Sequence, residues 1–478
     1  MARAKRPLPF FENVEITDAG AEGNAVARVN ERVLFVPFAA PCDVVDVQVI
    51  KKRKAYYEGR ITTIKEYSTY RSEPRCEHFG LCGGCKWQHL DYKYQKSFKQ
   101  KQVKDSLERI AKVSFPEIQD ITGADNVYYY RNKLEFTFSN RRWLTELDTP
   151  FEEGGVSDIQ GLGFHLPGKF DKVLDIKHCY LQKEPSNDIR LAVKDFAVEK
   201  GYSFYNVRAQ EGFLRNMIIR TATSGDLMVV LIFGEDKPEH IETILLFLSE
   251  KFSEITSLMY IINTKQNDSI YDLEARLFKG KDYNLEIMQA AKTGQQALQF
   301  KVGPKSFYQT NPEQAWKLYK TAHDFADFKG DELVYDLYTG AGTIALFIAG
   351  SVKNVVGIEY VEEAVKNADK NATDNGISNV EFHWGDMAKL LDEDFIKTHG
   401  KPDVLITDPP RAGMHPKVIQ QILIAEPQKI VYVSCNPATQ ARDIALLDEK
   451  YKIVKVQPVD MFPQTHHVEN VILLHRKD

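Results

Sequence analysis

The last third of the chain alternates regularly between strand-like and helix-like segments, and this pattern constrains the fold more than any other feature. The expected strands are 333–337, 355–359, 380–383, 403–407, 430–434, 451–457 and 469–474. They are short, apolar and rich in β-branched residues, and segments of helical composition separate most of them. Such alternation predicts a doubly wound α/β sheet of the Rossmann-like class, whose last two strands form an antiparallel hairpin.

The fifth of these strands ends in a cysteine, Cys435. The next residue, Asn436, suits a helix N-cap, and Pro437 suits the first helical position. Residues 438–447, which follow, have helical composition. A thiol just outside a helix N-terminus is biased toward the thiolate, because the helix dipole stabilises negative charge there. An inert core cysteine is the alternative, but the local pattern predicts that Cys435 is a reactive nucleophile.

The seventh strand begins with a carboxylate, Glu469. In a hairpin, this strand starts at the same edge of the sheet at which the strand before Cys435 ends. Glu469 is therefore expected near Cys435 despite the separation in sequence, as a general base beside a nucleophile. A solvent-facing hairpin residue is the alternative for Glu469.

Carboxylates also lie at the ends of the first three strands, which suggests a cofactor pocket. Asp336 precedes the glycine turn 338–343, where it would repel a pyrophosphate, so S-adenosylmethionine is favoured over a dinucleotide. Glu359 is placed for the ribose hydroxyls and Asp386 for the adenine edge. Asp408, followed by Pro409-Pro410-Arg411, ends the fourth strand at the edge where such sheets bind ligands.

The N-terminal residues 12–66 contain closely spaced β-type runs interrupted by glycine and proline, which predicts a small OB-like barrel. In the barrel, Lys51, Lys52, Arg53 and Lys54 stand beside two tyrosines, a combination that binds phosphates and stacks bases. A basic helix is expected over 92–112, and its cations, Lys99 among them, are expected to neutralise phosphates as well. The formal net charge of −5 excludes a uniformly basic surface but not a local patch of this kind.

Three cysteines, Cys76, Cys82 and Cys85, form a C-x5-C-x2-C array, and Cys179 is the only cysteine in the stretch that follows. Four thiolates suit tetrahedral zinc or a [4Fe–4S] cluster, and the spacing does not decide between them. A zinc site could instead use His78, His89 or His178. With no apolar stretch long enough to span a membrane, the chain is expected to be cytoplasmic, where clustered cysteines favour metal or catalysis over disulfides.

A methyl donor, a cysteine nucleophile and a carboxylate base together allow the methylation of a carbon that is not itself nucleophilic. C5 of uracil is such a carbon. Addition of a cysteine to C6 makes C5 an enolate carbon that accepts the methyl group, and removal of the C5 proton then expels the cysteine. Cys435 and Glu469 are the residues expected to carry these steps.

Four motifs resemble those of the RNA uracil-5 methyltransferases: Ser434-Cys435-Asn436-Pro437, Asp408-Pro409-Pro410-Arg411, Phe307-Tyr308-Gln309 and the set Cys76, Cys82, Cys85 and Cys179. The resemblance covers nearly the whole chain, although Tyr308 replaces a phenylalanine more usual in the family. It implies that the barrel is a TRAM domain and that the four cysteines hold a [4Fe–4S] cluster. It also implies that the target is RNA, 23S ribosomal RNA first and the T-loop uridine of transfer RNA as the alternative.

The resemblance further implies that Phe307 packs on the base, that Gln309 contacts the cofactor or the uracil, and that Asp408 holds the uracil edge. The expected cofactor-binding residues are Gln309, Asp336, Tyr338, Gly340, Gly342, Glu359, Asp386 and Asp408. The expected domains of this monomer are a barrel at 1–70, a central α+β domain at 71–92 and 127–300, and a catalytic domain at 93–126 and 301–478. An acidic stretch at 141–160 is expected to be a surface loop.

Three other classes of protein are weighed against this one. A cytosine-5 RNA methyltransferase is expected to carry a cysteine where this chain has Arg411. An amino-group methyltransferase needs an aromatic residue at that position and does not need Cys435. A non-catalytic iron–sulfur RNA-binding protein has no use for the pair of Cys435 and Glu469.

Overall fold

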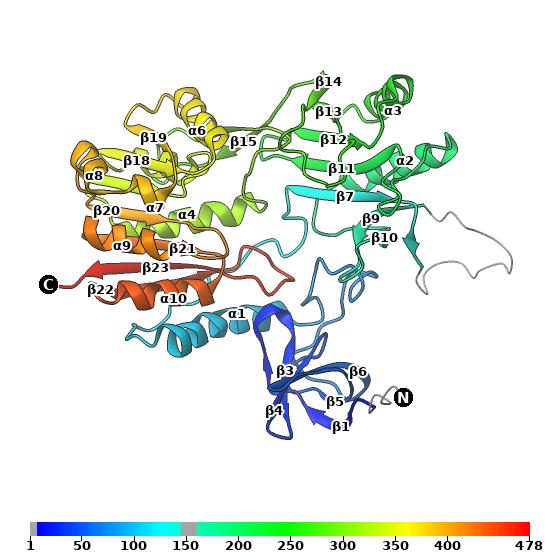
Figure 1. Cartoon of the computed structure of the whole chain (residues 1–478), viewed down its shortest axis with the longest axis horizontal. Coiled ribbons are helices and arrows are strands. Elements are labelled where there is room, and N and C mark those ends of the chain that lie inside the picture. The colour runs from blue at the N-terminus through cyan, green and yellow to red at the C-terminus, as the bar shows by residue number, and fades with distance from the viewer. Residues whose placement is uncertain (1–6, 145–159) are drawn as a thin grey trace, which may run out of the picture. The chain divides into compact units, whose positions relative to one another are not determined.

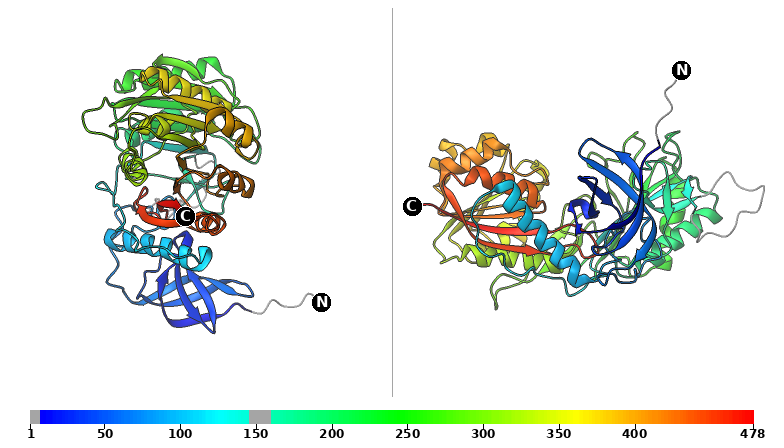
Figure 2. Two further views of the ribbon diagram at one scale, coloured as in Figure 1. Left: turned by 90° about the vertical axis from the view of Figure 1, so that its left-hand side faces the viewer. Right: turned by 90° about the horizontal axis from the view of Figure 1, so that it is seen from below.

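The computed structural model describes residues 7–144 and 160–478 (Figures 1 and 2). The expected loop at 141–160 thus lies mostly outside the described residues. The chain forms two compact units, here called unit 1 and unit 2. Unit 1 comprises Met1–Val127, Pro409–Ile419 and Tyr432–Asp478, and unit 2 comprises Tyr128–Asp408 and Gln420–Val431.

Unit 1 begins with a six-stranded sheet of order β1-β5-β6-β4-β3-β2. The strands are β1 (Phe10–Glu15), β2 (Asp18–Ala19), β3 (Ala25–Val29), β4 (Arg32–Val36), β5 (Val44–Lys52) and β6 (Tyr56–Glu66), with a short 3-10 turn η1 at Ala21–Gly23. Valines from β5, among them Val45, Val47 and Val49, are buried in its apolar core. Figure 2 shows the sheet, in blue, as a strongly curved one, in agreement with the barrel that the sequence predicts.

Unit 1 also contains the basic helix and the C-terminal hairpin. The elements are α1 (Tyr92–Ser106), which continues into the π-helical turn η2 (Leu107–Ala111), α10 (Pro437–Leu447), β22 (Tyr451–Val459) and β23 (Glu469–Arg476). β22 and β23 pair antiparallel, as predicted, and the second half of β21 (Lys429–Ser434) precedes them in the order β21-β23-β22. Both α1 and η2 pack against α10.

Unit 2 contains an eight-stranded sheet of order β14-β13-β12-β11-β7-β9-β10-β8. Its elements are β7 (Lys133–Ser139), β8 (Arg142–Trp143), β9 (Gly161–His165), β10 (Val173–Asp175), α2 (Ser186–Glu199), β11 (Leu214–Thr221), β12 (Leu227–Phe233), α3 (Pro238–Lys251), β13 (Ser257–Ile262) and β14 (Arg276–Gly280). A separate hairpin joins β15 (Asn284–Met288) to β16 (Leu298–Val302). The apolar faces of α2 and α3 pack on the sheet, which gives the expected α+β architecture.

Unit 2 also contains the parallel strands of the Rossmann-like sheet, in the order β19-β18-β17-β20, followed by the first half of β21. The elements are α4 (Pro312–Ala326), β17 (Leu333–Leu337), α5 (Thr343–Ala349), β18 (Asn354–Glu359), α6 (Glu362–Asp374), β19 (Val380–Trp384), α7 (Met387–Leu390), α8 (Glu393–His399), β20 (Val404–Thr407) and α9 (Pro416–Ala425). β17 and β20 are almost entirely buried, as continuous apolar runs in a parallel sheet should be. The predicted strands are confirmed to within two residues at nearly every boundary.

No helix within residues 7–144 and 160–478 is both long and apolar enough to cross a membrane.

Candidate active site

The turn after β17 packs tightly against β19, which β18 separates from β17 in the sheet. Tyr338, Gly340 and Gly342 all have positive φ, at 63°, 57° and 78°. This is unusual for Tyr338, whose Cβ disfavours the left-handed region. A Cβ added at Gly342 would lie 2.9 Å from Cζ of Phe382 in β19, so a side chain at this position would clash. The turn therefore needs glycine where the sequence analysis expected a cofactor loop.

Two of the predicted cofactor carboxylates lie at the ends of neighbouring strands. Glu359, the last residue of β18, accepts hydrogen bonds from the backbone N–H of Gly340 at 3.0 Å and of Val361 at 2.9 Å. Asp386 follows β19 and caps α7 by accepting from the backbone N–H of Ala388 at 3.0 Å. Each oxygen of Glu359 keeps acceptor capacity, because a carboxylate offers about four lone-pair sites. The two residues thus support the backbone and remain able to bind hydroxyl or amino groups.

Asp336, at the end of β17, is a fully buried carboxyl with one unsatisfied oxygen. Oδ2 accepts from the Thr339 hydroxyl at 2.5 Å, whereas Oδ1 has no hydrogen-bond partner in the described part of the chain. Burial, reinforced by the negative charges of Asp408 and Glu359, raises the pKa of Asp336 to about 7. Burial likewise raises the pKa of Asp408 to about 7. Perturbed carboxyls with unmet hydrogen-bonding capacity are typical of ligand sites.

The segment Phe307-Tyr308-Gln309 presents one aromatic ring to solvent and buries the next. The Phe307 side chain is 77% exposed, while Tyr308 is buried, and this burial raises the pKa of its phenol well above the usual value. Asn132 holds the segment by donating from Nδ2 to the Gln309 carbonyl at 3.2 Å. Arg220 donates to the carbonyl of Ser306 at 2.6 Å. The exposed ring of Phe307 therefore projects from a fixed backbone.

In unit 1, Cys435 stands one position before the N-cap of α10, as predicted. Asn436 is the cap: its Oδ1 accepts from the Ala438 N–H at 3.1 Å, and its Nδ2 donates to the Arg411 carbonyl at 3.0 Å. Pro437 fills the first helical position, where a missing N–H costs nothing. The Cys435 side chain is half-buried at the positive end of the helix dipole.

Gln440 of α10 joins the strand that leads to Cys435 to the strand that begins at Glu469. Its Nε2 donates to the Tyr432 carbonyl of β21 at 2.9 Å and to the Asn470 carbonyl of β23 at 3.2 Å. Asn470 donates back to Gln440 Oε1 at 2.8 Å. The end of β21 and the start of β23 therefore lie side by side, with Glu469 only 6% exposed. This is the arrangement that a nucleophile and base on one sheet edge require.

Asp443 is a fully buried carboxylate of α10 that was not predicted from the sequence. It accepts from the Tyr432 hydroxyl at 2.6 Å, from the Met414 N–H at 2.8 Å and, at its other oxygen, from the Arg442 guanidinium at 2.6 Å. These bonds tie α10 to β21 and to the segment that follows Arg411. Its position as the lone acidic residue of α10 is the only sequence signal for it.

A second contact, also not predicted from the sequence, holds the connection between β22 and β23. Lys99 of α1 lies 2.5 Å from Asp460, and both side chains are fully buried. Gln95 exchanges two hydrogen bonds with Gln464, at 3.0 Å and 2.9 Å. The connection also brings His467 within 3.0 Å of the Arg411 guanidinium. Hence Lys99, expected on a basic RNA-binding face, instead anchors the loop that leads into Glu469, and that expectation was wrong for this residue.

The basic cluster of the barrel is partly neutralised. Lys51 is half-buried and pairs with Glu58 at 2.6 Å. Lys52, Arg53 and Lys54 are exposed where β5 turns into β6. These three cations are therefore better placed for a phosphate backbone than Lys51.

The three clustered cysteines of unit 1 lie in consecutive turns. The Phe79 N–H donates to the Cys76 carbonyl at 3.0 Å, and the Cys82 N–H donates to the His78 carbonyl at 3.1 Å. Gly80 and Gly83 have positive φ, so the glycines let the chain reverse between thiols. In unit 2, the Cys179 backbone exchanges two hydrogen bonds with the Asn187 side chain.

The comparisons with known proteins agree with this geometry. The model of the tRNA (uracil-5-)-methyltransferase family matches residues 220–477, and the TRAM domain model matches residues 12–62. An uncharacterized RNA methyltransferase of Bacteroides thetaiotaomicron is 56% identical over 95% of this chain and 99% of its own. One from Porphyromonas gingivalis is 53% identical over 97% of this chain and 99% of its own.

A solved structure is also similar over nearly the whole chain. The crystal structure of Pyrococcus abyssi tRNA (uracil-54, C5)-methyltransferase in complex with S-adenosyl-L-homocysteine has a TM-score of 0.74 and 27% sequence identity. The match covers 97% of this chain and 100% of that one. The predicted family, fold class and TRAM domain are confirmed. The chain belongs to the RNA uracil-5 methyltransferase family and is a methyl-transferring enzyme.

Proposed function

We propose that this protein transfers a methyl group from S-adenosylmethionine to C5 of a uridine in RNA. The observation that carries the proposal is the placement of a thiol at the α10 N-terminus, where β21 ends, and of a buried carboxyl at the start of the adjacent strand β23. Gln440 ties the two strand ends together. Addition to C6 of the uracil needs the nucleophile, and removal of the C5 proton needs the base.

The residues around β17 to β20 fit the proposed methyl donor. The tight turn, the orphaned Oδ1 of Asp336 and the acceptor capacity of Glu359 offer polar partners but no cation for a phosphate. The proposed cofactor-binding residues are Gln309, Asp336, Tyr338, Gly340, Gly342, Glu359, Asp386 and Asp408. When bound, S-adenosylmethionine supplies the electrophilic methyl group.

In the proposed mechanism, the Cys435 thiolate adds to C6 of the uracil, and the electron pair of the C5–C6 double bond moves into an enolate. C5 would then bond to the methyl group of the bound donor while the sulfur–methyl bond breaks, so that the donor would leave as S-adenosylhomocysteine. Glu469 removes the proton that C5 still carries, the double bond re-forms, and the C6–sulfur bond breaks to return the thiolate. The helix dipole at α10 stabilises the thiolate both before addition and after release.

Two further residues are proposed to hold the base. The exposed ring of Phe307 offers a stacking face, and such stacking is worth about 1–3 kcal/mol per base. Burial raises the pKa of Asp408, which favours the protonated carboxyl. A protonated carboxyl offers both a donor and an acceptor, which matches the alternating groups of the uracil edge.

We also propose that Cys76, Cys82, Cys85 and Cys179 hold a [4Fe–4S] cluster with a structural role. The donor set of four thiols fits such a cluster, and positive φ at Gly80 and Gly83 lets the segment fold around a centre. Protein purified anaerobically should be brown and contain iron and acid-labile sulfide. Colourless protein with one tightly bound zinc ion and no sulfide would contradict this assignment.

For the target, we propose a uridine of 23S ribosomal RNA, with the barrel cations Lys51 to Lys54 binding the RNA backbone and the enzyme acting as a monomer. Transfer RNA is the second candidate, because the matching family and the similar Pyrococcus abyssi enzyme are both described as acting on it. Mapping 5-methyluridine in both RNAs, with and without the gene, distinguishes them. Loss of the modification from transfer RNA alone would overturn the ribosomal assignment.

The proposed reaction is tested with methyl-labelled donor and uracil-containing RNA. The wild-type protein is expected to form 5-methyluridine, and Cys435→Ala to form none. Cys42→Ala, at an exposed cysteine of the barrel, is the matched control and should keep full activity. A different methylated nucleoside as product, or activity in Cys435→Ala, would refute the proposal.

A further inference from the structure

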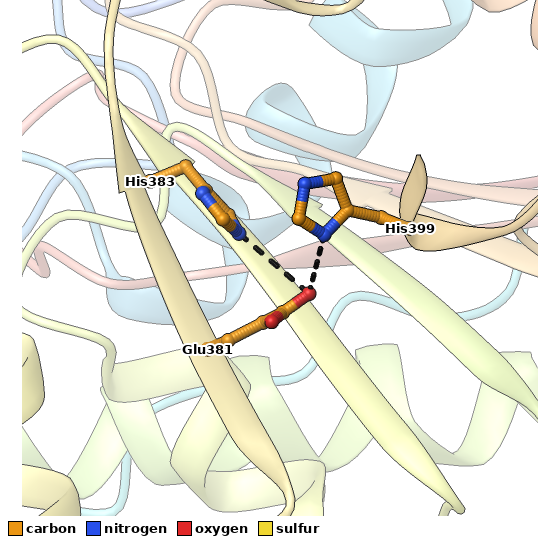
Figure 3. Close-up of side chains that lie close together, drawn as sticks. All are labelled: Glu381, His383 and His399. Carbon is orange, nitrogen blue, oxygen red and sulfur yellow. Dashed lines mark hydrogen bonds and ion pairs between the residues drawn. The ribbon is translucent and has the colours of Figure 1, made fainter. Parts of the chain in front are cut away.

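Two imidazoles and a carboxylate converge on one point at the edge of the Rossmann-like sheet (Figure 3). Glu381 and His383 belong to β19, and His399 is the last residue of α8. Oε1 of Glu381 lies 2.8 Å from Nδ1 of His399 and 3.6 Å from Nε2 of His383. One ligand atom from each residue lies within 4.8 Å of the others. This group is called the His₂Glu cluster below.

The strand geometry separates this cluster from the glycine turn. Glu381 and His383 are two positions apart in β19, so they share one face of the sheet. Phe382, between them, lies on the other face, where it packs on Gly342 and Gly357. The cluster also begins at the second residue of β19, whereas Asp386 follows the end of the strand. It is therefore not part of the proposed methyl-donor pocket.

The rings of the cluster are held in place by their neighbours. Phe395 packs on His383 and His399, with ring centroids 5.2 Å and 4.3 Å apart. The Tyr335 hydroxyl, from β17, donates to the carbonyl of Gly400 at 2.7 Å and so fixes the backbone next to His399. A site whose side chains are already positioned loses little conformational freedom when it binds an ion.

One ligand atom in the cluster is unsatisfied. Nε2 of His383 is buried and has no hydrogen-bond partner in the described part of the chain. Its distance of 3.6 Å to Glu381 is too long for a hydrogen bond. An unmet buried polar atom costs about 1–3 kcal/mol, so the structure keeps an unfavourable arrangement that a cation would relieve.

We propose that the His₂Glu cluster binds one divalent transition-metal ion of the zinc class. Imidazole and carboxylate ligands suit zinc, cobalt and nickel, and bond lengths of about 2.0–2.2 Å put neighbouring ligand atoms in a tetrahedron roughly 3.3 Å apart. The observed 2.8 Å and 3.6 Å separations bracket that value. Water completes the coordination. Because β19 is the edge strand of the sheet, the ion links this edge to α8 and has a stabilising role.

The proposal is tested by titrating the intact protein with Co²⁺ and then Zn²⁺. Wild-type protein should develop cobalt ligand-field bands without thiolate charge transfer, and Zn²⁺ should displace Co²⁺ and raise the melting temperature. Binding should weaken on acidification, because the ligands must be deprotonated.

The matched variants are His383→Gln, His399→Gln and the milder Glu381→Gln, with His165→Gln, at an exposed histidine of β9, as the control. Loss of a residue that merely hydrogen-bonds to a metal ligand weakens metal binding by roughly 10–100-fold. Loss of a ligand itself is expected to weaken binding of the ion at least as much. His165→Gln should bind as the wild type does. Equal binding by all variants, or no binding by the folded wild-type protein, would show a hydrogen-bonded ring cluster only and overturn the proposal.

Discussion

Asp336 and Asp443 are both fully buried carboxylates of this enzyme, but their surroundings are opposite. Asp336, in unit 2, accepts one side-chain hydrogen bond and has an orphaned oxygen, and two acidic neighbours help raise its pKa to about 7. Asp443, in unit 1, accepts from a phenol, a backbone amide and a guanidinium. Hydrogen bonds within the protein offset the cost of burying Asp443, whereas part of the cost of burying Asp336 is not offset.

The difference separates the proposed cofactor-binding region from the region that positions the proposed nucleophile and base. A carboxylate whose two oxygens both accept hydrogen bonds from protein groups, such as Asp443, fixes the helix and loop around the proposed Cys435 and Glu469 pair. A carboxyl that keeps an unmet acceptor, such as Asp336, is free to receive a donor from a ligand. At the proposed cofactor turn a buried acceptor is left unmet at a cost in stability, whereas the satisfied carboxylate of α10 adds rigidity.

The largest expected effect comes from removing the cation that neutralises a buried carboxylate. Lys99→Met leaves Asp460 buried without its cation and should lower the free energy of unfolding by about 3–5 kcal/mol. Lys104→Met, on the same helix but exposed, is the control and should change it by about 0–1 kcal/mol. Chemical denaturation measures both values. Similar small effects for the two variants would show that the Lys99 pair does not stabilise the loop.

Replacing the carboxyl of Asp336 should change how the stability of the protein depends on pH. The folded-state pKa of Asp336 is raised to about 7 from an unfolded value near 3.9, so its contribution to stability is present in acid and is lost as the pH rises toward 7. Asp336→Asn should flatten this loss in denaturation curves measured from pH 4 to pH 8, because the amide does not titrate. Asp369→Asn, at an exposed position of α6, should not flatten it. An unaltered profile in Asp336→Asn would contradict the assigned pKa.

Unit 1 should respond to pH in the opposite direction. Burial, together with the positive charges of His467 and Lys86, lowers the pKa of His466 to about 3. As the pH falls, His466 is therefore protonated in the unfolded state before it is protonated in the folded state. The stability falls as the pH drops below about 6.5, the ordinary pKa of histidine. His466→Gln should weaken this acid sensitivity, as measured by denaturation at pH 4 and pH 7. An equally acid-sensitive variant would show that other groups cause it.

The smallest expected effect is on RNA affinity. Replacing Lys52, Arg53 and Lys54 together by alanine should reduce the slope of log affinity against log salt by about 0.7–0.9 for each phosphate that the protein no longer neutralises. Lys51→Ala should change the slope less, because Lys51 already pairs with Glu58. Filter binding at several salt concentrations measures both. Unchanged slopes in the triple variant would show that the barrel does not bind the RNA.

The fold was largely predictable from the sequence because parallel buried strands and their helices leave strong local signals. The position of Cys435 was predictable for the same reason, since Asn436 and Pro437 are local markers of a helix start. Even Glu469 could be placed, because a short connection forces the last two strands into a hairpin.

What could not be predicted depends on contacts between distant residues. Lys99 and Asp460 are 361 positions apart, and a lysine among other lysines carries no sign that it is buried. The ion pair of Lys51 with Glu58 crosses a bulged strand pair, and the His₂Glu cluster combines a strand with a helix end. Such pairings require the register and packing of the folded chain.

The most direct test of the proposed mechanism is the fate of the Glu469→Gln variant with uridine RNA and methyl donor. Cys435 can still add to C6 and C5 can still be methylated, but no base removes the C5 proton. A methylated RNA bound covalently to the protein should therefore accumulate and survive denaturing electrophoresis. The double variant with Cys435→Ala should form no such species, and Glu449→Gln, at an exposed position, should turn over normally. Normal turnover by Glu469→Gln, or its failure to form any covalent complex, would contradict the assignment of Glu469 as the base that acts after methyl transfer.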